Sequence, residues 1–491
     1  MSRIVVVGAG VGGLAAAARL AALGHQVTIC EAADTVGGKL GTVEHAGFRF
    51  DTGPSLLTMP QVFRDLFDDT GGWPPELDLR PLEPLARYTF YGGSTFDASS
   101  DLDEHCARLD AELSAGSGDD WRAFHARAQR VWEASRLPFL ESALDGPRTL
   151  ARLAARQPRD ITAIAPGRSL RALGRRHLRD ARLRTYLDRY ATYTGSDPRR
   201  APAALAAVPY VEQEYGGWYV PGGLYRLGEA IRDRTVERGA VLRLGARVER
   251  IETTGGKAGG VVLAGGEQLP ADVVVANADA TTVYGSLAPN PAAARRLAKA
   301  TPSLSGFVLL LAVSGRTRGL AHHNVLFPRN YDAEFDAVFG DPARPAESPT
   351  LYVSAPDDPA LRPDGCEAWF VLVNAPRHGT GRGAVDWRAE GVAESYADRL
   401  LDLLGARGLP VRDRVLWSQI ISPADLEQRT GAVGGAIYGT SSNGSSAAFL
   451  RPANRSPVPG LFLVGGSSHP GGGLPLVALS AQIVAGLIGP A

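Results

Sequence analysis

A glycine-rich motif near the N-terminus limits the fold of this chain more than any other feature. Four apolar residues, Ile4 to Val7, precede it, and an alanine-rich segment follows it. This order is typical of a buried parallel strand, a tight turn that lets the backbone approach a pyrophosphate, and a helix whose free amides favour phosphate. The motif predicts a Rossmann-like dinucleotide site in which four glycines contact the cofactor: Gly8, Gly10, Gly12 and Gly13.

An acidic residue ends the next apolar segment. Val27 to Cys30 is predicted to be a second parallel strand, and Glu31 follows it, 23 residues after Gly8. This is close to the roughly 20 residues expected for the acid that hydrogen-bonds a ribose 2′-hydroxyl. An acid here favours NAD or FAD over NADP. A tight turn without a ligand is the alternative, but the strand, helix, second strand and acid together favour dinucleotide binding.

Two further glycine-rich turns extend the predicted cofactor path. In flavoproteins built on this first unit, a Gly-Gly-cation segment lies along the pyrophosphate and ribityl chain, and an Asp-Thr-Gly-Pro turn lies near the flavin ring. Either could be an ordinary turn, but together they favour FAD over NAD. The candidate residues are Gly38, Lys39, Gly53 and Pro54. Asp51 is expected to hydrogen-bond the turn around Thr52 and Gly53.

Composition and length exclude several classes of protein. The 491 residues are enough for two or three lobes, and the 52 basic and 52 acidic residues cancel, so no net charge points to nucleic acid. The three cysteines lack metal-ligand spacing, which favours a reducing cytosol and predicts no metal site. We expect no signal peptide, because the N-terminus enters a strand almost at once without an apolar h-region or a cleavage pattern. We expect no spanning helix, because no run of about 20 uncharged apolar residues occurs.

The section from Asp101 to Pro209 has a helical pattern. Apolar residues recur at intervals of three and four, for example at Trp121, Phe124 and Ala128. The part from Arg148 to Arg200 holds 14 arginines against four aspartates. A basic amphipathic helix can lie on an anionic membrane surface, and the alternative is the solvated face of a helical cap. The pattern predicts a helical cap that faces a membrane.

The rest of the chain predicts a second sheet and a return to the first. Strands at 304–311, 324–327, 350–354 and 368–374 predict a mostly antiparallel sheet, closed by a helix at 385–404. The C-terminal segment repeats the opening order of strand, glycine-rich loop and helix. The predicted fold class is α/β, with a Rossmann-like FAD-binding domain assembled from discontinuous segments, a mixed or antiparallel-sheet substrate domain and a membrane-facing helical cap. The FAD-binding domain takes residues 1–100, 211–300 and 441–491, the cap 101–210, and the substrate domain 301–440.

These motifs resemble one family nearly end to end. The chain resembles the bacterial-type carotenoid (phytoene) desaturases, FAD-dependent members of the amine-oxidase-like flavoproteins. Beyond the opening motif, the resemblance rests on Gly37 to Lys39, Phe50 to Ser55, Tyr219 to Gly223, and above all Arg451-Pro452 with Gly465 to Pro475. General amine oxidases share the opening motif but differ in the last one.

The resemblance implies removal of hydrogen from C–C bonds of a long hydrophobic polyene, with FAD as hydride acceptor. It implies a cytoplasmic protein at the membrane surface, with quinone or oxygen as the final electron acceptor. Segments 189–195, 201–203 and 434–439 look closer to the hydroxycarotenoid 3,4-desaturase branch than to the branch that acts first on phytoene. By the same resemblance, the FAD contacts would be Gly8, Gly10, Gly13, Glu31, Lys39, Val248 (backbone toward adenine), Gly466 and Leu476, with Gly465 and Pro475 in the same tail segment.

The catalytic base is left open by the sequence. His469 is predicted to lie beside the flavin, and Asp188 and Tyr193 fall on the helical segment that would roof the cavity. Each has a structural alternative, as a loop-ordering histidine or as helix surface and core. Two other functions stay open: a flavin amine oxidase or protoporphyrinogen-oxidase-like enzyme, and a non-catalytic flavin-carrying, lipid-binding protein.

Overall fold

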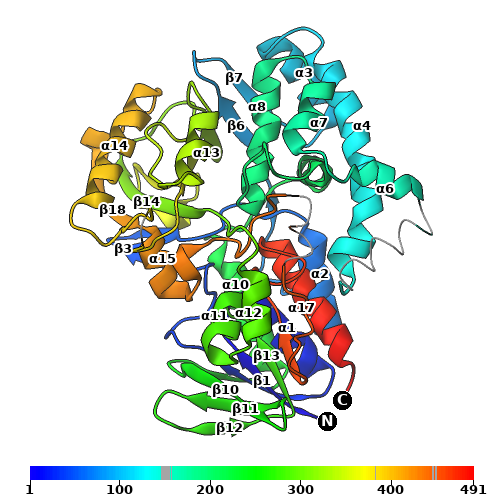
Figure 1. The fold of residues 1–491 in the computed structure, drawn as a ribbon. Helices are drawn as coiled ribbons and strands as arrows, with labels where there is room; N and C mark the ends of the chain where they lie inside the picture. The colour runs from blue at the N-terminus through cyan, green and yellow to red at the C-terminus, as the bar shows by residue number, and fades with distance from the viewer. Residues whose placement is uncertain (145–154, 156–157, 382, 445–446, 448–450) are drawn as a thin grey trace.

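The computed structural model describes residues 1–144, 155, 158–381, 383–444, 447 and 451–491. Figure 1 shows a lower part that holds both chain ends, a helical part at the upper right and a second sheet at the upper left. The lower part contains blue, green and red segments, so it is drawn from the start, the middle and the end of the chain. Three arginines of the basic section, Arg148, Arg152 and Arg156, lie outside the described residues.

The lower part is built on a five-stranded parallel sheet with the order β19-β13-β1-β2-β9. β1 pairs in parallel with β2 on one side and with β13 on the other. Strands from distant parts of the sequence share this sheet, which confirms a Rossmann-like sheet assembled from discontinuous segments. The strands are β1 (Arg3–Val7), β2 (Gln26–Cys30), β9 (Val241–Arg243), β13 (Val273–Ala276) and β19 (Leu461–Leu463).

Helices cover this sheet, and α1, which is rich in alanine and largely buried, contacts α10 and α17. Small side chains let these helices approach closely. The helices of this part are α1 (Val11–Ala22), α2 (Pro60–Asp69), α10 (Tyr225–Glu237), α11 (Ala280–Thr282), η4 (Val283–Leu287), α12 (Pro291–Leu297) and α17 (Leu474–Ile488). A separate antiparallel sheet consists of β10 (Val248–Thr254), β11 (Lys257–Leu263) and β12 (Gln268–Pro270), and two short pairs are β3 (Thr42–His45) with β4 (Phe48–Asp51) and β5 (Arg80–Pro81) with β8 (Trp218–Tyr219).

The second sheet has seven strands in the order β18-β14-β17-β16-β15-β6-β7. Only the β15–β6 pair is parallel, so the mostly antiparallel sheet is confirmed. Its strands are β6 (Ala86–Thr89), β7 (Thr95–Ala98), β14 (Ser305–Ser314), β15 (His323–Leu326), β16 (Leu351–Ser354), β17 (Cys366–Ala375) and β18 (Val415–Ile421). The predicted domain boundary at residue 100 falls after the chain has already entered the second sheet. The strands β6 and β7, which contain the buried residues Tyr88 and Phe96, belong to that sheet.

The helices of this second part are α13 (Asp332–Val338), η5 (Pro359–Leu361), α14 (Val392–Ala406), η6 (Arg412–Arg414), α15 (Pro423–Thr430) and η7 (Val433–Gly435). The helix predicted from residue 385 starts only at Val392. Gly391 precedes it with a φ of +75°, a left-handed conformation that a continuous α-helix cannot contain.

The cap is helical, as the sequence predicts. Trp121, Phe124 and Ala128 are all buried on α4, and the apolar residues Leu173 and Leu187 of the arginine-rich helices α7 and α8 are buried too. The membrane-facing role stays a prediction. No helix within the described ranges is long and apolar enough to cross a bilayer. The cap helices are α3 (Leu102–Glu112), α4 (Ser117–Arg136), η1 (Leu137–Glu141), α6 (Pro158–Ile164), α7 (Leu170–His177), α8 (Ala181–Arg189), η2 (Tyr190–Thr194), η3 (Ala203–Ala206) and α9 (Ala207–Tyr215).

Candidate active site

The first glycine-rich turn lies at the carboxyl ends of β1 and β2, the edge at which parallel sheets of this kind bind dinucleotides. A β-carbon on Gly13 would lie 2.1 Å from the carbonyl oxygen of Gly8, so only glycine lets α1 pack this closely. Gly10 is the N-cap residue of α1 and has no side chain that could accept a hydrogen bond from the first amides of the helix. The first amides of the helix are therefore available to a phosphate.

The second and third turns lie against the first. A β-carbon on Gly38 would lie 3.3 Å from the α-carbon of Gly10, and one on Gly53 would lie 1.8 Å from the carbonyl oxygen of Lys39. Half-buried Pro54 follows directly. The structure thus brings three glycine turns, separate in sequence, into one continuous stack.

Asn277 connects this stack to the C-terminal loop, and the sequence analysis missed it. β-Carbons on Gly12 and Gly465 would lie 2.9 and 2.4 Å from its Oδ1 atom. The two glycines also face each other, since a β-carbon on Gly12 would lie 3.1 Å from the α-carbon of Gly465. The available signal was a polar residue directly after the apolar strand β13, at the edge where parallel strands end.

Glu31 is fixed beside the first turn. Its Oε2 accepts a hydrogen bond from the amide of Ala9 at 2.6 Å, and its Oε1 accepts one from the amide of Ala33 at 2.9 Å. Val248 belongs to the same buried cluster as Cys30, the residue before Glu31. The amide of Ala246, two residues before Val248, donates to the backbone carbonyl of Glu31 at 2.7 Å, so the segments that carry the predicted adenine and ribose contacts are adjacent.

We expect Glu31→Ala to weaken flavin retention about tenfold, because the variant loses the predicted ribose contact and leaves the Ala9 amide without its acceptor. Glu31→Gln keeps one acceptor oxygen and should give an intermediate result. The measurement is the flavin-to-protein absorbance ratio after dialysis. A fully yellow Glu31→Ala protein would contradict the assignment.

A half-buried lysine and a buried arginine lie near the C-terminal loop. The Nζ of Lys39 donates to the carbonyls of Ala436 and Ile437 at 2.9 and 2.6 Å. Burial lowers the pKa of Lys39 to about 8, with Asp279 opposing the change. Burial likewise lowers the pKa of Arg451 to about 10, again opposed by Asp279. One carboxylate thus faces two cations, and this side of the site carries buried positive charge.

Arg451 and Asn454 hold the loop between β19 and α17. Arg451 donates to the carbonyls of Tyr438, Gly466 and Thr440 at 3.0, 2.7 and 2.6 Å. The Nδ2 of Asn454 donates to the carbonyl of His469 at 2.8 Å. Pro475 and Leu476 lie in the first turn of α17, which also has no capping hydrogen bond from a side chain.

Asp51 does not hydrogen-bond the turn around Thr52 and Gly53, so that prediction is wrong. Its two oxygens accept hydrogen bonds from the amides of Leu224 and Tyr225 at 2.7 and 3.0 Å, at the start of α10. Free amides at a helix N-terminus attract a carboxylate, which explains the preference. Burial raises the pKa of Asp51 to about 6, opposed by these two hydrogen bonds.

His469 is buried, and its Nε2 lies 2.9 Å from the carbonyl oxygen of Ser142. A carbonyl only accepts, so this nitrogen carries the proton. Burial lowers the pKa of His469 to about 4, which makes the ring neutral at pH 7 and a weak base. The residue lies in the C-terminal loop as predicted, and its catalytic role stays a prediction.

The lowered pKa of His469 gives a pH-dependent contribution to stability. Between about pH 6.5 and 4 the unfolded chain binds the proton and the folded chain does not, so the free energy of unfolding falls by about 3 kcal/mol as the pH is lowered through this range. His469→Gln lacks this titration, and its midpoint of thermal unfolding should fall less between pH 7 and 4.5. Parallel pH profiles for the two proteins would contradict the burial of a neutral ring.

The three predicted catalytic residues do not form one hydrogen-bonded group within the described part of the chain. Buried Asp188 pairs with Arg171 at 2.8 Å, and burial raises the pKa of Asp188 to about 6. Tyr193 donates to Glu212 at 2.9 Å. Asp188 and Tyr193 therefore have different partners although both belong to the cap.

Glu212, on α9, is a buried carboxylate that the sequence analysis missed. Only 3% of its surface is exposed, and it accepts hydrogen bonds from Tyr190 at 2.7 Å and from Tyr193. Burial raises its pKa. The signal was a glutamate inside a mostly apolar helix, which by itself does not separate a core residue from a site residue.

The Tyr193 segment reaches the C-terminal loop through the ring of Tyr438. A β-carbon on Gly195 would lie 3.0 Å from this ring, and one on Gly472 would lie 2.5 Å from it. The ring therefore lies between the cap and the loop. This contact brings residue 195, two residues after Tyr193, close to the C-terminal loop.

The described residues fit a dinucleotide cofactor. The glycine stack has no room for side chains, the helix amides lack a side-chain cap, and a fixed carboxylate stands at the end of β2. Fold and site together define a dinucleotide-binding protein with a second, mostly antiparallel sheet.

Comparison with known proteins specifies the class. The family model for flavin-containing amine oxidoreductases matches residues 11–489. The chain belongs to that family and, within it, to the carotenoid desaturases, which confirms the resemblance seen in the sequence. It is 37% identical to a hydroxyneurosporene desaturase of Cereibacter sphaeroides, covering 98% of this chain and 96% of that one. It is 35% identical to a 4,4′-diapolycopene oxygenase of a Methylomonas species (98% and 97%) and 31% identical to a 1-hydroxycarotenoid 3,4-desaturase of a Flavobacterium species (99% and 99%).

Solved structures agree on the fold. An oxidoreductase from Methanosarcina mazei matches with a TM-score of 0.66 at 18% identity, over 98% of this chain and 99% of that one. A putrescine oxidase bound to putrescine matches with a TM-score of 0.65 at 16% identity, over 99% of each chain. At these identities the likeness concerns the fold alone. The family membership identifies the chain as a flavin-containing oxidoreductase.

Proposed function

We propose that this chain is an FAD-dependent desaturase that introduces C=C bonds into a long acyclic carotenoid, by phytoene-type or 1-hydroxycarotenoid 3,4-desaturation. The observation that carries the proposal is the C-terminal loop, where Gly465 lies against Gly12 and Arg451 fixes the backbone, in a member of the carotenoid desaturase family. FAD, when bound, supplies the hydride acceptor.

The predicted contacts divide the cofactor site into two halves. Gly10, Gly12 and the start of α1 would hold the pyrophosphate, with Glu31 on the ribose and the backbone of Val248 toward adenine. The C-terminal loop would hold the flavin half. The buried positive charge of Lys39 and Arg451 favours a reduced, more negatively charged cofactor, which supports an oxidation of the substrate.

Desaturation also needs a base, because a proton leaves the carbon next to the one that loses hydride. We propose the Tyr193–Glu212 pair. Burial, together with the charge of Glu212, raises the pKa of Tyr193, so a free tyrosinate is unfavourable. The proton would instead pass to the Tyr193 oxygen while the phenol proton passes to Glu212. His469 is a weak base with Nε2 already bonded, and Asp188 is paired with Arg171.

Removing one hydroxyl separates this role from a packing role. We expect Tyr193→Phe to lower the desaturation rate about a hundredfold with flavin content unchanged, because the proton path is cut. Tyr190→Phe is the matched control, since Tyr190 donates to the other oxygen of Glu212 but would not receive the proton. Equal rates for the two variants would remove Tyr193 from the mechanism.

A carotenoid oxygenase is the second candidate, because one relative of comparable identity carries that name. Both reactions use the same class of substrate. Desaturation removes two hydrogen atoms, whereas oxygenation adds oxygen, so the product mass distinguishes them.

The function is tested by expression in hosts that make phytoene, lycopene or 1-hydroxylated carotenoids, with pigments resolved by chromatography and mass. We expect a longer conjugated system with one of these substrates. Unchanged pigments together with oxygen consumption on an amine would favour an amine oxidase and refute the proposal.

We also propose a cytoplasmic protein that associates peripherally with the membrane, because an apolar polyene partitions into the bilayer. Its electrons would pass on to quinone or oxygen. Liposome flotation at low salt tests the association, and absence of binding there would refute it.

A further inference from the structure

Ser55 ends the third turn of the glycine stack, the turn predicted to lie near the flavin ring. Its hydroxyl oxygen lies 2.6 Å from the phenol oxygen of Tyr352, which is 297 residues further along the chain. The turn is fixed on the stack, because Gly53 packs without room for a side chain against the carbonyl of Lys39. Ser55 itself is half-buried, so part of its surface is still accessible.

Tyr352 is held in turn by a buried histidine. Tyr352 belongs to β16, and His323 belongs to the neighbouring strand β15. His323 lies opposite Ser354 in the antiparallel register, two residues from Tyr352, so the side chains of Tyr352 and His323 share one face of the second sheet. The Nδ1 of His323 lies 2.8 Å from the phenol oxygen of Tyr352. Ser55, Tyr352 and His323 therefore form one hydrogen-bonded row between the turn and the second sheet.

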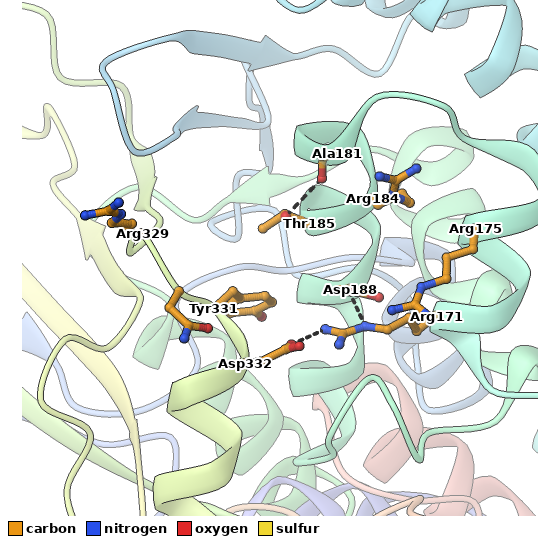
Figure 2. A pocket seen from close by; sticks show the side chains of 10 residues that line it. Arg171, Arg175, Ala181, Arg184, Thr185, Asp188, Arg329, Tyr331 and Asp332 are labelled. Atoms are coloured by element: carbon orange, nitrogen blue, oxygen red, sulfur yellow. Dashed lines mark hydrogen bonds and ion pairs between the residues drawn. The ribbon is translucent and has the colours of Figure 1, made fainter.

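The second sheet is also fixed on the side of the cap. Arg171 of the cap contacts Asp188 at 2.8 Å and Asp332, the first residue of α13, at 2.6 Å, as the dashed lines in Figure 2 mark. The helix α13 is the next element after β15 in the chain. The strand that carries His323 is thus connected to an anchored helix, and Tyr352 reaches the turn from a fixed support.

The hydrogen bonds of this row have a direction. Burial, together with the charge of His322, lowers the pKa of His323 well below its usual range, so its ring is neutral at pH 7 and carries one proton. His323 is 1% exposed, and its Nε2 has no hydrogen-bond partner among the described residues. A buried N–H without an acceptor costs more than an unused lone pair, which places the proton on Nδ1. Nδ1 then donates to Tyr352, Tyr352 donates to Ser55, and the hydroxyl proton of Ser55 is free for another acceptor.

We propose that Tyr352 is a positioning residue that makes Ser55 a hydrogen-bond donor to the flavin ring. Most polar atoms of that ring are nitrogen or carbonyl-oxygen acceptors, so a donor is the group that suits it. A donor aimed at such an acceptor stabilises the negative charge that the ring gains on reduction, and loss of the donor lowers the reduction potential of the bound flavin. This role rests on the flavin placement of the proposed function, but not on the identity of the substrate.

The reduction potential of the bound flavin measures this role without any carotenoid. The FAD-loaded full chain is reduced stepwise against a reference dye, and the flavin is followed by its absorbance. Ser55→Ala removes the donor, Tyr352→Phe removes the group that orients it, and Ser55→Thr keeps the hydroxyl. Tyr331→Phe is the matched control (Figure 2), because Tyr331 is buried and its hydroxyl has no hydrogen-bond partner among the described residues.

We expect Ser55→Ala to lower the equilibrium constant of the two-electron reduction about tenfold, which is a fall of about 30 mV in potential. Tyr352→Phe should lower it about threefold in the wild type and not at all in the Ser55→Ala background, because it acts only through Ser55. Ser55→Thr and Tyr331→Phe should match the wild type.

An unchanged potential in Ser55→Ala, additive shifts in the double variant, or an equal shift in Tyr331→Phe overturns the proposal. The predicted shifts in a protein that desaturates no carotenoid would support this role and refute the proposed function alone. Thermal unfolding and flavin content verify that the variants are folded.

Discussion

Gly13→Ala is expected to abolish flavin binding and to destabilise the protein by about 3 kcal/mol, because the new methyl group would overlap a backbone atom. The β-carbon would lie 2.1 Å from the carbonyl oxygen of Gly8, and about 3.1 Å from the side chain of Asn277. No rotation of a side chain relieves the first contact. Helix α1 must move away from β1, and the phosphate site at its N-terminus moves with it.

Gly486→Ala is the matched control, since it makes the same change inside a helix of the same lobe. A β-carbon there meets nothing within 4 Å. Alanine is a better helix former than glycine, so this variant should be more stable by about 0.5–1 kcal/mol and keep its flavin. Thermal unfolding and flavin absorbance measure both variants. Similar behaviour of the two would contradict the close packing of α1 on β1.

Arg451→Met should have the second large effect, a loss of about 4 kcal/mol in stability together with release of the flavin. The guanidinium donates to three main-chain carbonyls, and methionine fills a similar volume while leaving all three without a donor. The C-terminal loop then loses its fixed position relative to residues 438–440. The variant also removes one of the two positive charges near Asp279, because only that of Lys39 remains.

Arg455→Met serves as the comparison, four residues further along. Arg455 is exposed and lies 5.3 Å from the ring centre of Phe462, a contact worth about 0.5–1 kcal/mol. This variant should keep its flavin. If Arg451→Met also retains a full complement of flavin after gel filtration, Arg451 does not organise the cofactor site.

Local sequence patterns predicted the elements that carry strong periodicity. The apolar runs before Gly8 and Gly465 are buried strands of one parallel sheet, and the spacing of Trp121, Phe124 and Ala128 is a helix that buries those residues. In each case the signal lies within a few neighbouring residues. Such local patterns predict the element correctly because an apolar face is buried whichever other segment packs against it.

Contacts between segments that are distant in the sequence could not be predicted from local patterns. Asp51 binds the start of α10, more than 170 residues away, because the free amides there attract a carboxylate more than its own turn does. The local sequence around Glu212 and Asn277 does not mark either residue as functional. Their importance follows from contacts with distant residues: Glu212 with Tyr193, and Asn277 with Gly465. The Arg171 ion pairs likewise join segments that no periodicity relates.

Anaerobic mixing of the FAD-loaded protein with a 1-hydroxylated acyclic carotenoid in liposomes tests the central claim most directly. Flavin absorbance and the chromatographed pigment are followed in the same sample. The account predicts that the flavin bleaches as a new double bond forms, with one double bond for each flavin reduced. The account would be contradicted if this carotenoid, lycopene and phytoene all stayed unchanged while an amine bleached the flavin.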